Sequence, residues 1–246
     1  MITQYHRPSD LDEALALVSQ PNTMPLGGGT SLTAVDSSGP LSVVDLQLIG
    51  LDGLDSNGDI VTIGAMTLLQ ELAESSKVPP VLRDLAHREA PNTIRNAATL
   101  GGTIASAHAE SELLAGLLAF DTTLFLSRTD GSKTIPLSKA LEDLSVFDGA
   151  IITHVSLAAT GTAVAHRTAR TPADRPIVAV IGRRTASGET VIAATGLGSG
   201  PSLIDQDRLQ TLQPLSDFRG STEYRSRLAW VLTKRVIEDL EKEPVL

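Results

Sequence analysis

The 246-residue chain contains no cysteine, and aromatic residues make up only 3% of it. Without cysteine the chain cannot form disulfides, thiolate zinc sites, a cysteine-bound iron–sulfur cluster or a thiol nucleophile. The scarcity of aromatic residues predicts a core built from Ala, Val, Leu and Ile. The absence of cysteine is also compatible with a reducing compartment such as the cytoplasm.

Positive charge is scarce as well, because 20 Lys and Arg residues stand against 29 Asp and Glu residues, a net charge of −9. An acidic chain without a basic run is not expected to bind nucleic acid or an anionic membrane. The sequence contains no apolar run of about 18 residues, so no membrane span is expected. Its first residues lack the apolar core of a signal peptide. We therefore expect a cytoplasmic protein.

Two common nucleotide-binding motifs, G-x-G-x-x-G and G-x-x-x-x-G-K-[ST], are missing. The chain has instead two glycine clusters, Gly27-Gly28-Gly29-Thr30-Ser31 and Thr99-Leu100-Gly101-Gly102-Thr103. Glycine lets backbone N–H groups approach a ligand closely, and successive N–H groups in a turn suit phosphate oxygens. Together the clusters could hold the two phosphates of one dinucleotide from opposite sides. For either cluster alone, a tight turn between a strand and a helix is the alternative.

The alternation of helical and strand patterns predicts an α+β protein, or α/β units, with small sheets. A short strand and a helix are expected within residues 1–20, and a turn at Asp55–Gly58. After Asp148 the pattern changes to short β segments separated by Gly, Pro and Ser, ending in a long helix over about 221–241. This predicts an N-terminal domain over 1–148, with subdomains of about 1–50 and 51–148, and a C-terminal antiparallel module over 149–246. Further helices are expected at 67–75, 80–90, 112–120 and 136–144, and strands at 23–26, 41–46, 60–64, 122–127, 151–157, 163–168, 177–183 and 190–197.

Four segments resemble, in order and spacing, the FAD-binding (medium) subunit of molybdenum hydroxylases such as xanthine dehydrogenases and aerobic carbon monoxide dehydrogenases. Asn92–Ser106 is similar to "I-R-N-x-x-T-[IL]-G-G-N-[IL]", and Leu26–Leu32 to "A-G-G-T-[DS]-L". Val61–Thr67 resembles "I-G-A-x-T", and Ser216–Ala229 resembles "S-x-x-Y-R-x-x-[LM]-A". The resemblance covers almost the whole chain.

The resemblance implies a vanillyl-alcohol-oxidase-like (PCMH-type) FAD-binding fold of two subdomains. It also implies a C-terminal domain like that of carbon monoxide dehydrogenase flavoproteins. FAD would lie between the subdomains. Electrons would come from an iron–sulfur (2Fe–2S) small subunit and a molybdopterin large subunit, and pass through FAD to NAD, oxygen or a quinone. The chain itself would hold no metal and supply no catalytic side chain. Two alternatives are a flavin-free structural subunit of the same fold and a stand-alone flavin oxidoreductase.

Cofactor contacts carried over from the family fall on the two glycine clusters and on three later residues. The departures from the family pattern are Thr103 in place of Asn, Glu112 in place of Asp, and Ala165-His166 where an aromatic residue is common. Glu110 and Glu112 are not expected to act as an acid–base pair, since residues two apart on a helix face different ways. Arg95 is either a surface or a loop-anchoring arginine, with bracing of the second cluster favoured. The expected cofactor-binding residues are Gly27, Gly28, Gly29, Thr30, Ser31, Thr99, Gly101, Gly102, Thr103, Ser106, Glu112 and Arg167.

Overall fold

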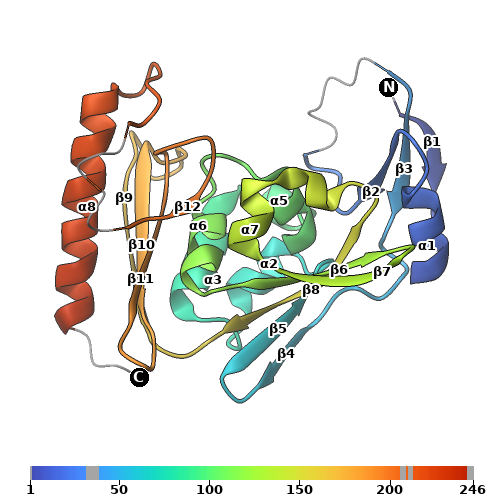
Figure 1. Cartoon of the computed structure of the whole chain (residues 1–246), viewed down its shortest axis with the longest axis horizontal. Helices are drawn as coiled ribbons and strands as arrows, with labels where there is room; N and C mark the ends of the chain where they lie inside the picture. Colours follow the sequence, from blue (N-terminus) through green and yellow to red (C-terminus); the bar gives the residue numbers. More distant parts are fainter. Residues whose placement is uncertain (1, 32–38, 206–208, 210–212, 243–246) are drawn as a thin grey trace.

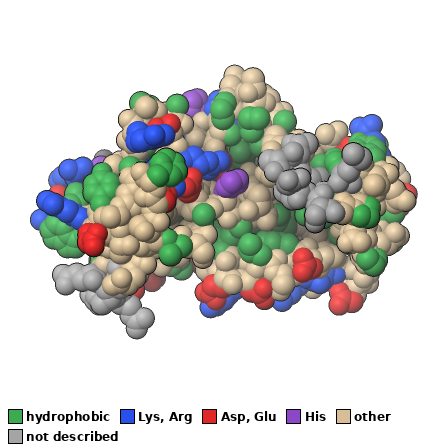
Figure 2. Space-filling view, turned by 90° about the horizontal axis from the view of Figure 1, so that it is seen from above, with side chains coloured by type: hydrophobic (Ala, Val, Ile, Leu, Met, Phe, Trp, Pro, Cys, Tyr) green, Lys and Arg blue, Asp and Glu red, His purple; other side chains and the backbone are tan. Residues whose placement is uncertain are grey.

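A computed structural model of the chain describes residues 2–31, 39–205, 209 and 213–242. Three sheets follow one another along the sequence, with helices between and beside them (Figure 1), so the predicted α+β class is confirmed. Leu32, the last residue of the first family-like segment, lies outside the described residues. On the face seen in Figure 2, the described Lys and Arg side chains are interspersed with Asp and Glu rather than gathered into one basic surface. None of the described helices is both long and apolar enough to cross a membrane.

The first sheet is parallel, with the strand order β1-β3-β2. Helix α1 (Leu11–Val18) packs against it through Ala14, Leu15 and Val18, which are all buried. Asp10 is the N-cap of α1, because its side chain accepts a hydrogen bond from the backbone N–H of Glu13 at 2.9 Å. The strands are β1 (Ile2–His6), β2 (Thr23–Leu26) and β3 (Leu41–Asp45).

The second sheet is antiparallel and has the order β4-β5-β8-β6-β7. Its strands are β4 (Leu54–Asn57), β5 (Ile60–Gly64), β6 (Thr123–Arg128), β7 (Gly131–Pro136) and β8 (Ile151–Ala158). The helices of this part are α2 (Leu69–Glu74), α3 (Pro80–Glu89), α4 (Asn92–Arg95), α5 (Leu100–Ser106), α6 (Glu112–Ala119) and α7 (Leu137–Glu142), followed by a 3-10 helix over Leu144–Phe147.

Two predictions for this part of the chain are wrong. The strand over Ile151–Leu157 was assigned to the C-terminal module, but β8 pairs with β5 and β6 in the middle of the five-stranded sheet. Hydrophobic alternation marks a strand without saying which distant strand it joins. The segment Asp55–Gly58 was assigned to a turn because of its Asp, Ser, Asn and Gly residues, yet most of it forms β4, which pairs with β5. The division of the chain into domains over 1–148 and 149–246 stays a prediction.

The third sheet has the order β12-β11-β10-β9 and is antiparallel. Its strands are β9 (Thr162–Thr168), β10 (Val178–Arg184), β11 (Thr190–Thr195) and β12 (Ser202–Leu203). Helix α8 (Thr222–Lys242) lies along the outer face of this sheet (Figure 1), while α6 contacts β10 and β11 from the inner side.

Alternate residues of β10 point to different helices, as the pleat of a strand requires. Val178 and Val180 belong to the apolar cluster that contains the buried face of α8. Ala179 and Ile181 belong to the main core together with α6, whose eight residues are all buried. The C-terminal sheet is therefore covered on both faces, and its inner face shares one core with the five-stranded sheet and the helices packed on it.

Gly182 provides a test of how closely α8 packs on this sheet. A Cβ at this position would lie 2.3 Å from Val236 Cγ1 and 3.0 Å from Leu240 Cδ1. We expect Gly182→Ala to lower the free energy of unfolding by about 1–3 kcal/mol, since overpacking displaces α8. Denaturant unfolding followed by circular dichroism measures this change.

Gly198→Ala is the matched control, because a Cβ there meets nothing within 4 Å. It should change the unfolding free energy by less than about 0.5 kcal/mol. Equal effects of the two substitutions would show that the contact between α8 and Gly182 is looser than described.

Candidate functional site

The two glycine clusters, separated by about 70 residues of sequence, touch each other in the folded chain. The first follows β2 directly, and Gly29 has a φ of +72° that favours glycine. A Cβ on Gly28 would lie 1.6 Å from the carbonyl oxygen of Ala97, and one on Gly27 would lie 2.6 Å from Thr99 Oγ1. Glycine is therefore required here for the first cluster to pack against the segment that leads into the second.

The second cluster is the start of helix α5 rather than an open turn between strand and helix. Thr99 is the N-cap, and its hydroxyl accepts a hydrogen bond from the N–H of Gly102 at 3.1 Å. The N–H of Gly101 donates to the carbonyl oxygen of Ala65 at 2.8 Å, and the N–H of Leu100 to that of Thr67 at 2.9 Å. The first amides of α5 thus fasten this helix to the end of β5, instead of standing open as the sequence interpretation assumed.

Both clusters line one cavity of about 180 Å³. Apart from Met24, Pro25 and Leu26, its wall consists of glycine backbone, small side chains and hydroxyl groups. The hydroxyls come from the first cluster, from the cap of α5 and from the end of α5. The wall residues that were predicted to bind the cofactor are Gly27, Gly28, Gly29, Thr30, Ser31, Thr99, Gly102 and Ser106.

A larger cavity of about 680 Å³ adjoins the first, and the two share Met24, Pro25, Gly27, Thr99, Gly102 and Ala105. It lies between the parallel sheet and the five-stranded sheet, and Gly101 also lines it. Its other walls are mainly apolar and include Val18, Leu41, Leu46, Met66, Phe147 and Ile152.

Of the remaining predicted residues, Thr103 lines neither of these two cavities, and its hydroxyl donates to the carbonyl oxygen of Thr99 at 2.9 Å. Glu112 and Arg167 also line neither cavity, and they pair with each other. Arg167 Nε lies 3.3 Å from Glu112 Oε1, and Arg88 Nε lies 3.9 Å from Glu112 Oε2. Their predicted contacts with the cofactor stay predictions, and the described arrangement gives both residues a partner within the protein.

Glu112 is a buried acid, with only 5% of the residue exposed to water. Removal from water raises the pKa of this carboxyl above its ordinary value of 4.5, although Arg167 and Arg88 act to lower it. The nearby Glu89 carboxylate raises the pKa further.

Glu89 is a buried acid that the sequence analysis missed. Its Oε2 accepts a hydrogen bond from Ser111 Oγ at 2.9 Å and one from the N–H of Leu113 at 3.3 Å, both at the start of α6. Its Oε1 lies 3.1 Å from Arg175, which belongs to the connection between β9 and β10. A glutamate at the end of a helix, three residues before the motif segment that begins at Asn92, carries no signal of this role in one sequence.

Arg95 has the anchoring role that was one of its two interpretations. It is 6% exposed and donates to the carbonyl oxygens of His87 and Ala90 at 2.8 and 2.7 Å. Its Nε donates to Gln70 Oε1 at 2.8 Å. These bonds fix the end of α3 against α2 and so hold the segment that leads into the second glycine cluster.

Residues 1–159 match the model of the family described as "FAD binding domain in molybdopterin dehydrogenase". The chain belongs to this family. The chain binds FAD and is an oxidoreductase subunit, as the family resemblance of its sequence implied. The matched region ends one residue after β8, so the whole five-stranded sheet falls within the FAD-binding part.

Relatives and a solved structure match nearly the whole chain. YgfM of Escherichia coli (strain K12), itself an uncharacterized protein, is 26% identical over 98% of both chains. The carbon monoxide dehydrogenase medium chain of Afipia carboxidovorans is 27% identical over 95% of both chains. In the crystal structure of quinoline 2-oxidoreductase from Pseudomonas putida 86, a chain with 22% identity superposes with a TM-score of 0.86, covering 97% of this chain and 96% of that one. The last likeness shows the shared fold.

The residues around the two cavities fit FAD. A diphosphate needs close hydrogen-bond donors and room beside the backbone, which the glycine and hydroxyl wall of the smaller cavity offers. A ring system needs apolar walls, which the larger cavity offers through Phe147, Met66 and the leucines named above. The cradle depends on the missing Cβ atoms, because a side chain on Gly27 or Gly28 would fill the space where the two segments meet.

Gly28→Ala tests this cradle. The new Cβ cannot coexist with the Ala97 carbonyl oxygen, so the two segments must separate and the shared cavity must change shape. We expect a cost of about 1–3 kcal/mol, which corresponds to FAD binding about 5- to 150-fold weaker. Titration of the apoprotein with FAD, followed by flavin fluorescence, measures the dissociation constant. Gly200→Ala, where a Cβ meets nothing within 4 Å, is the control and should bind FAD like the wild type. Unchanged affinity in Gly28→Ala would show that FAD binding does not depend on the close contact between Gly28 and Ala97.

Glu112→Gln tests the buried carboxyl through the pH dependence of stability. The pKa of the Glu112 carboxyl is higher in the folded state than its ordinary value of 4.5, so protonation of this carboxyl stabilises the folded state. This stabilisation is fully present below pH 4.5 and is lost as the pH rises through the raised pKa. Glutamine cannot titrate. We therefore expect the stability of the wild type relative to the variant to fall as the pH rises from about 4.5. Melting temperatures at a series of pH values measure this difference. The exposed Glu241→Gln variant should show no such trend, and a rising difference for Glu112→Gln would contradict the burial argument.

Proposed function

We propose that this chain is the electron-transfer subunit of a molybdenum hydroxylase complex and passes electrons from partner iron–sulfur clusters through FAD to an external acceptor. The observation that supports this most is the convergence of two glycine segments on one cavity in a chain of the FAD-binding family. When bound, FAD supplies reversible uptake and release of one or two electrons, and the protein supplies binding, orientation and electrostatics.

The work of this chain's own residues is binding and shaping rather than proton transfer. In the described walls of the smaller cavity, the polar groups are hydroxyls and backbone amides, with no carboxylate, imidazole or amine among them. Glu110 and Glu112 are both engaged by arginines, at Arg219 and Arg167. An electron carrier needs no acid or base of its own, because the flavin performs the redox step.

The other redox groups would belong to partner chains. With no cysteine in the sequence, a cysteine-bound 2Fe–2S cluster would be held by another subunit or domain. Relatives named as medium chains are found in carbon monoxide dehydrogenase and in the glyceraldehyde dehydrogenase of Sulfolobus acidocaldarius, the latter 31% identical over 56% of this chain. We propose a 2Fe–2S small subunit and a molybdopterin large subunit as partners, with NAD, oxygen or a quinone as the acceptor. For location we propose the cytoplasm.

Removal and restoration of FAD in the assembled complex tests this function. The complex purified with its partner subunits is stripped of FAD and supplied with carbon monoxide, glyceraldehyde or quinoline, the substrates that the relatives' names suggest. We expect reduction of NAD, oxygen or a quinone to stop without FAD and to return when FAD is added back. Reduction of an artificial dye that takes electrons directly from the molybdenum subunit should continue throughout.

Three outcomes would contradict the proposal. Acceptor reduction that is indifferent to FAD would remove the flavin from the electron route. A chain that cannot be loaded with FAD would be a structural subunit of the same fold. Turnover of a small substrate by the isolated, FAD-loaded chain would make it a stand-alone flavin oxidoreductase.

A further inference from the structure

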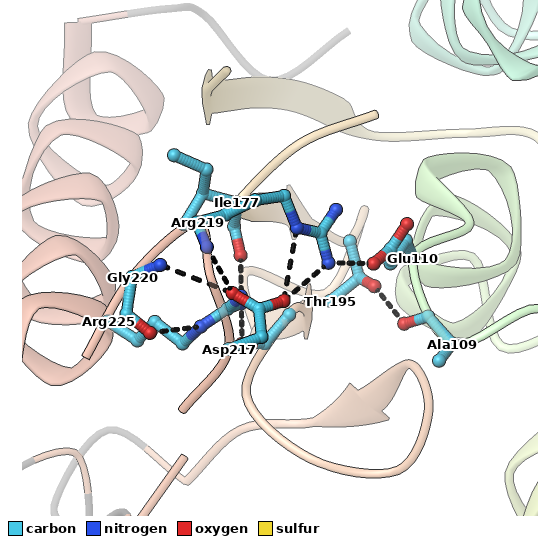
Figure 3. A network of polar contacts seen from close by, with 9 residues as sticks. Ala109, Glu110, Ile177, Thr195, Asp217, Arg219, Gly220 and Arg225 are labelled. Atoms are coloured by element: carbon cyan, nitrogen blue, oxygen red, sulfur yellow. Dashed lines mark hydrogen bonds and ion pairs between the residues drawn. The ribbon is translucent and has the colours of Figure 1, made fainter. Parts of the chain in front are cut away.

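The loop that follows α5 is held mainly by the C-terminal part of the chain. Residues 107–111 connect Ser106, which lines the smaller cavity, to the start of α6. Thr195 of β11, fully buried, donates through its hydroxyl to the carbonyl oxygen of Ala109 at 2.6 Å. Arg219, in the segment before α8, forms an ion pair with Glu110 of the same loop (Figure 3).

Asp217 holds the guanidinium group of Arg219 in place beside the loop. Asp217 Oδ2 accepts hydrogen bonds from Arg219 Nη2 at 2.8 Å and from Arg219 Nε at 3.1 Å. The other carboxylate oxygen lies 2.7 Å from Arg225 Nη2. Although partial burial acts to raise it, the hydrogen bonds from Arg219 and Arg225 hold the pKa of Asp217 well below its ordinary value.

Arg225 anchors this network in the C-terminal sheet. It donates to the carbonyl oxygen of Ile177 at 2.6 Å and to that of Gly196 at 2.9 Å, and its side chain is almost fully buried. Gly196 directly follows Thr195, the residue that holds Ala109. Figure 3 shows both connections reaching the loop side by side, one directly from β11 through Thr195 and one from Arg219, which Asp217 and Arg225 link to the same sheet.

The charges across this boundary are sorted by sign. In the ion pairs that join the two parts among the described residues, the acids Glu89, Glu110 and Glu112 lie on the FAD-binding side, and the arginines Arg175, Arg219 and Arg167 come from the C-terminal part. The other end of α5 is fastened on the FAD-binding side, through Ala65 and Thr67. Helix α5 is therefore held at its start by one part of the chain and just beyond its end by the other.

We propose that Arg219, acting through Glu110, is a positioning residue that lets the C-terminal part set the affinity of the cavity for FAD. Arg219 lines neither cavity, so it acts on the wall formed by Gly102, Ala105 and Ser106 rather than on the cofactor. By linkage, FAD binding stabilises the attachment of the loop to the C-terminal part to the same extent. The proposal needs FAD binding and is independent of the electron route proposed above.

A double-mutant cycle with Glu110→Gln and Arg219→Gln tests it. FAD affinity is measured by titration at a temperature at which near-UV circular dichroism shows every variant folded. We expect each single variant to bind FAD about 5- to 10-fold more weakly, and the double variant no more weakly than either single one. Arg227→Gln, an exposed arginine of α8, is the control and should bind FAD like the wild type. Glu110→Gln leaves the Asp217–Arg219–Arg225 contacts intact, so it reports on the loop even if Arg219→Gln fails to fold.

Hydrogen exchange separates positioning from simple structural support. In the wild type, FAD should slow exchange in residues 107–112, and Glu110→Gln should reduce that protection. Lower melting temperatures with unchanged FAD affinity and unchanged protection would overturn the proposal, as would losses that add in the double variant. Failure of the electron route in the complex would leave all these affinities as they are, so the two proposals fail separately.

Discussion

The contact between Gly28 and the backbone at Ala97 is the constraint on which the site depends. A strand end from the parallel sheet and the start of α5 meet with no room for a Cβ, and this contact shapes the cavity between them. Interior packing is dense enough that one added methyl group cannot be absorbed without moving one segment. Arg95 supports the contact from behind, because it fixes the chain that carries Ala97 to the end of α3. The cofactor site is therefore a property of how two distant segments pack.

Much of the fold could be predicted from the sequence, because its signals are local. Capping at Asp10 and the apolar repeat of the last helix both depend on residues within a turn or two. Strand pairing is not local. β8 looks like the strands that follow it, and only its hydrogen bonds to β5 and β6 show where it belongs. The prediction for β4 was wrong because its residues are polar, as in a turn, although they form an edge strand of the sheet.

The candidate site was predictable as a set of segments but not in its internal bonding. The pairing of the two glycine clusters followed from their composition and from the family resemblance, and both line the same cavity. The motif could not predict that the N–H of Gly101 donates to the carbonyl oxygen of Ala65, because this acceptor lies 36 positions earlier in the chain. Likewise Glu112 and Arg167, each assigned to the cofactor, stand against one another across a boundary between distant segments. Ion pairs of this kind require the fold before they can be seen.

A crystal structure of the chain with bound FAD tests the central claim most directly. We expect the diphosphate in the cavity between the first glycine cluster and α5, within hydrogen-bond distance of groups from Gly27–Ser31 and of a hydroxyl from Thr99–Ser106. We also expect an unchanged contact between Gly28 and Ala97. A diphosphate bound elsewhere, or one reached only after the two glycine segments have moved apart, would contradict this claim.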